Sequence, residues 1–118
     1  MASRRLDVVS YLSSQALFKD LDQGALTRLA DATEVRRLSR GDTIFQAGEA
    51  CEGLYLVVEG LVKLYARSSQ GHEKVLEVIG MGGCLSEALM FSEVAHSVNA
   101  SALFDVQLLM IPKDALLQ

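Results

Sequence analysis

Residues 41–49 read GDTIFQAGE and residues 54–66 read LYLVVEGLVKLYA, and these two stretches decide the fold. The second stretch holds two runs of branched and aromatic residues, one on each side of Gly60, and such runs favour extended strands. In the first stretch a short apolar run lies between two turns that contain glycine. Short strands separated by glycine turns indicate a β-rich domain.

The same pattern continues on both sides of this region. Turn residues and alternation predict a hairpin turn at 68–71, a strand with one buried face at 73–79, a short helix at 85–91 and strands at 94–103 and 106–111. Pro112 then opens a helix over 113–118, because proline is tolerated in a first helical turn. Amphipathic helices are expected at 4–13 and, capped by Asp22, up to Ala32. A mainly β, double-sheet jelly roll (a double-stranded β-helix) is the simplest way to bury about eight such strands. The sequence therefore predicts this fold, with short flanking helices.

Length and composition predict one domain with a packed core. The chain has 118 residues, and half of them are hydrophobic. We expect the N-terminal helices at about 4–32, the roll at about 33–112 and the start of a following helix at 113–118, all within a single domain of residues 1–118.

Charge and hydropathy exclude several classes of protein. Eleven Lys and Arg against fifteen Asp and Glu give a net charge of −4, so the chain alone is a poor binder of nucleic acid. No apolar run approaches the roughly 20 residues of a membrane-spanning helix. The chain is therefore expected to be soluble and cytoplasmic, without a membrane partner. In a reducing cytosol Cys51 and Cys84 are expected to be free and partly buried.

Motifs of catalysis and metal binding are missing from the sequence. A cupin-like metal site needs about three converging ligands, but the only histidines are His72 and His96, and no Cys-x-x-Cys occurs. There is no Gly-x-Ser-x-Gly elbow and no P-loop. We therefore expect no catalytic residues, no metal site built from side chains and no enzyme.

The glycine spacing resembles that of the sensor domain of CRP/FNR-type transcription regulators, a cyclic-nucleotide-binding-like β-roll. The resemblance rests on Gly41, Gly48 and Gly60 with the strands between them, and it covers nearly the whole chain. Glycines in such turns allow the backbone to adopt a positive φ or allow two strands to approach closely. The resemblance implies a homodimeric regulator that binds promoter DNA through a dimerisation helix and a helix-turn-helix domain, both expected to lie C-terminal to this chain.

A phosphate-binding cassette follows the glycine-rich turn in that family. By resemblance, Glu87 matches the carboxylate that holds a ribose and Ser97 matches a small hydroxyl position. Ser86 replaces the usual glycine, and His96 stands where an arginine holds the cyclic phosphate. A mostly neutral imidazole does not reproduce a bidentate guanidinium, so this pattern disfavours cyclic nucleotides.

Residues 71–78 and 87–91 are most similar to the nitric-oxide-responsive branch, the dissimilatory nitrate respiration regulators, which are thought to sense through haem. The effector-pocket candidates are Leu85, Ser86, Glu87, Ala88, His96 and Ser97. The candidates for a haem ligand are His96 and His72, whereas Met81, Met90 and Met110 are expected to pack rather than to coordinate. Two alternatives remain open at this stage: a cAMP-binding domain in which Glu87, Ser86 and Ser97 hold the nucleotide, and a ligandless scaffold for protein contacts.

Overall fold

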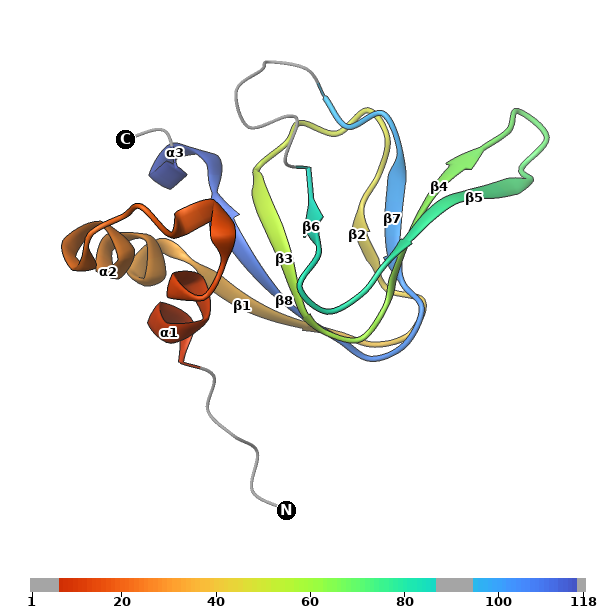
Figure 1. Cartoon of the computed structure of the whole chain (residues 1–118). Coiled ribbons are helices and arrows are strands. Elements are labelled where there is room, and N and C mark those ends of the chain that lie inside the picture. Colours follow the sequence, from red (N-terminus) through yellow and green to blue (C-terminus); the bar gives the residue numbers. More distant parts are fainter. Residues whose placement is uncertain (1–6, 87–94, 117–118) are drawn as a thin grey trace.

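The chain folds into a β-roll of two antiparallel sheets flanked by short helices (Figure 1). This computed structural model describes residues 7–86 and 95–116. The described helices are α1 (Val8–Ser13), the 3-10 turn η1 (Ala16–Phe18), α2 (Gln23–Ala32) and α3 (Lys113–Leu116). The described strands are β1 (Glu34–Leu38), β2 (Thr43–Phe45), β3 (Gly53–Glu59), β4 (Val62–Arg67), β5 (Glu73–Ile79), β6 (Cys84–Leu85), β7 (Asn99–Ala102) and β8 (Val106–Pro112).

Each sheet has four strands, and the two sheets face each other across the roll. One sheet has the order β1-β8-β3-β6 and the other has the order β2-β7-β4-β5. The β4–β5 hairpin extends beyond the body of the roll, whereas the helices gather on the outer face of the first sheet (Figure 1). The expected double-sheet roll is confirmed.

Strand β8 separates two hydrophobic cores. Leu108 and Met110 point into the roll, where they pack with residues of both sheets. Leu109 and Ile111 point to the other face and pack beneath the helices. Because side chains alternate along a strand, one strand supplies both cores.

The helix covering the second core begins where the sequence predicts. The Asp22 carboxylate accepts a hydrogen bond from the Ala25 amide at 2.8 Å, which caps the first turn of α2. Asp7 caps α1 in the same way by accepting from the Ser10 amide at 3.1 Å. The expected helix at 4–13 is confirmed from Val8 onward, and its first residues lie outside the described ones.

Glycine turns join the strands as expected. Gly41, Gly48 and Gly60 have φ of +90°, +94° and +91°, a region that side chains disfavour. At Gly60 there is a second requirement, because a Cβ atom would collide with the Asp105 carbonyl oxygen and with Val106. The β3–β4 turn therefore lies directly against the turn that precedes β8.

Three sequence expectations need correction. Strand β5 has no buried face: Val75, Leu76 and Val78 are 53%, 50% and 50% exposed, because the hairpin projects past the facing sheet. Met81, expected to pack, is 78% exposed.

The third correction concerns the start of the helix expected at 85–91. Leu85 pairs with Tyr55 as part of β6, and Ser86 has φ +70°, so neither residue is helical. The rest of that expected helix lies outside the described residues. At the other end of the roll Pro112 closes β8, one residue before α3 begins.

Among the described residues Cys51 and Cys84 form no disulfide, and both are partly buried, as expected. In the described part of the chain, no helix is long and apolar enough to cross a membrane.

Candidate functional site

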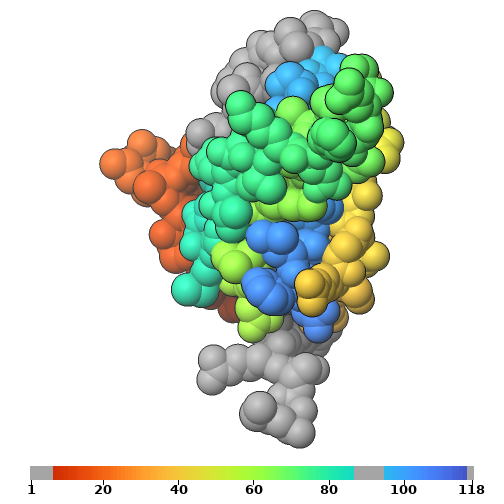
Figure 2. All heavy atoms as spheres, turned by 90° about the vertical axis from the view of Figure 1, so that its right-hand side faces the viewer, coloured from red at the N-terminus to blue at the C-terminus, as the bar shows by residue number. Residues whose placement is uncertain are grey.

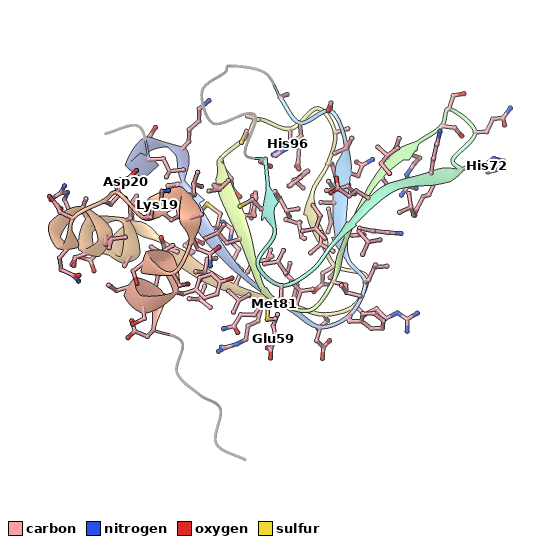
Figure 3. The ribbon with its side chains drawn as sticks, in the orientation of Figure 1. Lys19, Asp20, Glu59, His72, Met81 and His96 are labelled. Carbon is pink, nitrogen blue, oxygen red and sulfur yellow. The ribbon has the colours of Figure 1, made fainter. Side chains whose placement is uncertain are left out.

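His96 lies at one end of the roll and is buried, with 5% of its surface exposed. It precedes β7, and its backbone is clamped to the loop between β2 and β3. The Gly48 amide donates to the His96 carbonyl at 2.8 Å, and the His96 amide donates to the Glu49 carbonyl at 2.9 Å. These two bonds fix where the imidazole enters the roll (Figure 3).

An aromatic stack holds the imidazole. The rings of His96 and Phe45 lie 3.7 Å apart and nearly parallel, at 8°. Phe45 in turn contacts Tyr55, with 5.7 Å between ring centroids. Stacking on aromatic rings therefore connects His96 with the core inside the roll.

The ring nitrogens of His96 are in different surroundings. Nδ1 lies 3.4 Å from the Ser86 hydroxyl, a long contact whose direction depends on the tautomer. Nε2 is buried and has no hydrogen-bond partner among the described residues. Since a buried polar atom without a partner is costly, Nε2 is a candidate contact point for a ligand.

Burial lowers the pKa of His96 below its ordinary value of 6.5, although the carboxylates of Glu49 and Glu52 act in the opposite direction. The imidazole is therefore neutral at pH 7. A neutral imidazole can coordinate a metal or haem iron, whereas it offers no positive charge to a phosphate.

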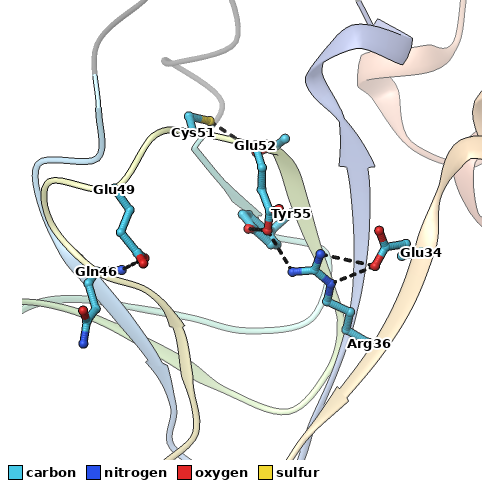
Figure 4. Close-up of polar contacts among 8 residues, drawn as sticks. Glu34, Arg36, Gln46, Glu49, Cys51, Glu52 and Tyr55 are labelled. Carbon is cyan, nitrogen blue, oxygen red and sulfur yellow. Dashed lines mark hydrogen bonds and ion pairs between the residues drawn. The ribbon is translucent and has the colours of Figure 1, made fainter.

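A network of charged and polar groups lies next to the loop between β2 and β3 (Figure 4). The Glu52 carboxylate accepts from the Tyr55 hydroxyl at 2.8 Å and from Arg36 at 3.0 Å. These hydrogen bonds, led by that from Tyr55, lower the pKa of Glu52. Arg36 also pairs with Glu34 at 3.2 Å. The network joins β1 and β3 next to the loop that clamps His96.

The same loop reaches the last helix. The Glu52 carbonyl accepts a hydrogen bond from the Lys113 amide, the first residue of α3, at 3.0 Å. Residues 46–52 are thus bonded to His96 near one end and to the start of α3 at the other.

The structure brings together some of the predicted pocket residues. Leu85 is buried, and Ser86 and His96 are in contact. Ser97 is exposed. Glu87 and Ala88 lie outside the described residues. His72, the other haem-ligand candidate, is exposed at the tip of the β4–β5 hairpin, far from His96 (Figure 3).

Sequence reasoning missed the groups that support His96. Phe45 and Tyr55 are part of the motif that carried the family resemblance, but we interpreted them as fold residues only. Nothing in the sequence pointed to Glu52, because its partners Arg36 and Tyr55 lie on separate strands and the pairing depends on the fold. In the described part of the chain, no group of three or more His, Cys, Asp or Glu side chains could hold a metal ion.

Comparison with known proteins identifies the family. A model of the cyclic nucleotide-binding domain matches residues 35–118, and the chain belongs to this family. The sensor domain of the transcriptional regulator DNR from Pseudomonas aeruginosa is 30% identical, with a TM-score of 0.85 over 92% of this chain and 73% of that one. The N-terminal domain of a Streptomyces coelicolor A3(2) transcriptional regulator is 34% identical, with a TM-score of 0.76 over 93% of this chain and 75% of that one.

A third relative is longer than this chain. The CRP-like cAMP-activated global transcriptional regulator of Mycobacterium tuberculosis is 26% identical over 105 residues, which are 89% of this chain and 47% of that protein. The chain thus spans about half the length of this relative. Together these likenesses define a regulatory sensor domain of the CRP/FNR type rather than a catalytic domain.

Proposed function

We propose that this chain is the effector-sensing domain of a CRP/FNR-type transcription regulator that responds to nitric oxide through haem. In this proposal residues 1–118 form the sensor, and a C-terminal dimerisation helix and helix-turn-helix bind promoter DNA as a cytoplasmic homodimer. The observation that carries the proposal is the buried Nε2 of His96, which has no partner among the described residues. The likeness to the DNR sensor domain supports the transcription-regulator part of the proposal.

The surroundings of His96 fit a residue that would hold haem. Its imidazole is neutral, its orientation is fixed by Phe45, and its Nε2 is buried without a partner among the described residues. When bound, haem would supply the iron to which nitric oxide binds. His96 would hold the group, while Phe45 and Leu85 would exclude water from it.

The clamp loop at 46–52 supports a route by which the effector controls the rest of the protein. A shift of His96 changes the two backbone bonds to Gly48 and Glu49, and the loop carries the change to Lys113. An effector can only redistribute states that it binds with different affinity. The proposal therefore requires that His96 and α3 take a different arrangement when the effector is bound.

A haem titration tests the proposal. We expect saturable Soret absorbance with the wild-type chain, loss of at least 10-fold in affinity in His96→Phe, and no change in His72→Gln. His96→Phe retains an aromatic ring against Phe45, so loss of binding is not loss of the stack. Adding nitric oxide should then shift the Soret band. Equal haem affinity in wild type and His96→Phe would exclude His96 as the ligand.

A cyclic nucleotide is the second candidate, favoured by the family match itself and by the cAMP-activated relative. Ser86 and Ser97 would then hold the phosphate with Glu87 on the ribose. Calorimetric titration of cAMP decides between the two: saturable binding tighter than about 10 μM favours this candidate. A chain that binds neither haem nor cAMP would be left with the ligandless scaffold role.

A further inference from the structure

Glu52 connects three elements of the molecule through one residue. Its carboxylate oxygen Oε1 accepts hydrogen bonds from the Tyr55 hydroxyl on β3 at 2.8 Å and from Arg36 on β1 at 3.0 Å (Figure 4). Its backbone carbonyl accepts from the Lys113 amide at the start of α3, also at 3.0 Å. The side chain of Glu52 therefore holds two strands of the first sheet, while its backbone holds the helix that follows the roll.

The hydrogen bond from Tyr55 leads into the roll. Tyr55 is buried, and this burial, together with the bond to Glu52, raises the pKa of its hydroxyl well above the ordinary value of 10.0. The hydroxyl therefore keeps its proton and donates it to Glu52 near neutral pH. The Tyr55 ring contacts Phe45, which stacks on His96 with 3.7 Å between ring centroids. A chain of packed rings thus runs from the Glu52 carboxylate to the imidazole.

A second path joins the same two residues along the backbone. The loop at 46–52 contains Gly48, whose amide donates to the His96 carbonyl, and Glu49, whose carbonyl accepts from the His96 amide. Glu52 is the last residue of this loop, directly before β3. Glu52 and His96 are therefore linked twice, through the rings and through the loop backbone. A displacement of one residue would change at least one of these paths.

The partner of Glu52 on β1 does not depend on Glu52 alone. Arg36 also pairs with Glu34 at 3.2 Å, and its guanidinium lies over the Tyr55 ring at 6.0 Å from the centroid. Loss of the Glu52 carboxylate would leave Arg36 paired with Glu34, which avoids the large cost of an unpaired charge. Substitutions at Glu52 should therefore fold, and their local effects can be measured.

We propose that Glu52 is a positioning residue that holds His96 inside the roll and α3 against the roll, so that the two move together. Calling His96 part of an effector site rests on the proposed function, but the linkage between His96 and α3 needs no effector. A coupling free energy acts equally in both directions. Disturbing Glu52 should therefore loosen both ends, and disturbing the start of α3 should loosen His96.

Amide hydrogen exchange of the effector-free chain, followed by NMR, tests the first expectation. Glu52→Ala should accelerate exchange of the His96 and Lys113 amides about 10-fold relative to the amide of Leu109, which lies in the middle of β8. Such a local change differs from a general loss of stability, which would accelerate all three amides alike.

Glu73→Ala is the matched control for this substitution. The Glu73 carboxylate also accepts from two cations, Lys63 and Arg67, but on the β4–β5 hairpin. In Figure 2 the green atoms of this hairpin cover the upper part of the face shown, and the orange helices appear only at one side. Removing this carboxylate should leave the exchange of the His96 and Lys113 amides unchanged.

Two substitutions in α3 test the reverse direction. Lys113→Pro removes the amide that donates to Glu52, and proline is tolerated in a first helical turn. Lys113→Ala changes the side chain and keeps that amide. We expect the His96 amide to exchange about 10-fold faster in Lys113→Pro and at the wild-type rate in Lys113→Ala.

Three results would overturn the positioning role of Glu52. They are an acceleration in Glu52→Ala confined to Lys113, an equal acceleration of the Leu109 amide, and a His96 amide that does not respond to Lys113→Pro. None of these measurements contains haem. Failure of the haem titration would therefore overturn the proposed function and leave this linkage standing, whereas failure of the exchange experiment would overturn the linkage alone.

Discussion

Gly60 shows at the scale of one residue how backbone contact shapes this fold. Replacing it with alanine forces a side chain into φ +91° and into the Asp105 carbonyl. We expect Gly60→Ala to lower the free energy of unfolding by about 2–4 kcal/mol, the sum of the conformational and the overpacking cost. Urea denaturation of the two chains measures the difference.

Gly71 provides a matched control for that prediction. Its φ of +86° is similar, but no atom lies within 4 Å of the position that a Cβ would take there. Gly71→Ala should therefore cost only the conformational part, about 1 kcal/mol. If both substitutions cost the same, the contact with Asp105 contributes nothing to the requirement for glycine at position 60.

His96 should make stability depend on pH. Burial holds the pKa of its folded state below 6.5, so the unfolded chain binds an additional proton between the two pKa values. The free energy of unfolding therefore falls as the pH drops below about 6.5, and the loss ends once the pH is below the folded pKa.

The variant His96→Phe removes this contribution. Unfolding free energies of wild type and His96→Phe, measured between about pH 7.5 and about pH 5, should diverge in favour of the variant as the pH falls. Other titrating groups are common to both chains and cancel in the difference. A constant difference over this range would mean that His96 titrates alike in the folded and unfolded chain.

At the scale of elements, β5 and β8 differ in burial, although both strands contain runs of apolar residues. Strand β8 is central in its sheet and buried on both faces, whereas β5 is an edge strand that extends past the roll. A register shift in the β4–β5 ladder and the charges of Lys74 and Glu77 protect its open edge from pairing with other chains.

Truncation of one leucine in each strand should reveal this difference. Leu108→Ala in β8 removes a fully buried side chain and should cost about 2–5 kcal/mol of stability. Leu76→Ala in β5, where half of the side chain is exposed, should cost less than about 0.5 kcal/mol. Chemical denaturation compares them directly, and a large loss in Leu76→Ala would show that β5 is covered in solution.

Local patterns predicted the elements better than the site. Turn glycines and apolar alternation indicated the strands, and Asp22 indicated the start of α2, because these signals act between near neighbours. The exposure of β5 was predicted wrongly, since its apolar sequence does not reveal whether another sheet faces it. The stack of His96 on Phe45 joins residues far apart in the chain, so neither periodicity nor spacing could predict it.

At the scale of the whole molecule, the two cores share one sheet. Leu12 of α1 packs on one face of that sheet and Leu108 lies on the other. Strand β8 contributes buried residues to both cores, so neither core stays packed without it. We therefore expect the helices and the roll to unfold in a single transition.

Two probes test this expectation in Leu12→Ala. The variant should lose about 2–5 kcal/mol, and its transitions by far-ultraviolet circular dichroism and by tyrosine fluorescence should coincide. With Tyr11 of α1 replaced by phenylalanine (Tyr11→Phe) in both chains, the remaining tyrosines, Tyr55 and Tyr65, are buried in strands of the roll and report on the part that the mutation does not touch. Separate transitions would mean that the helices unfold independently of the roll.

Because β8 is buried on both faces, insertions and deletions within it are less tolerable than point substitutions. Insertion or deletion of one residue between Val106 and Ile111 would exchange the inward and outward sets of side chains along the remainder of the strand. Leu108 and Leu109 are interchangeable in such a slip, but Gln107 would enter an apolar interior. Length variation among natural variants of this chain should therefore be confined to the hairpin tip and other exposed turns, and point substitution should be the only tolerated change within β8.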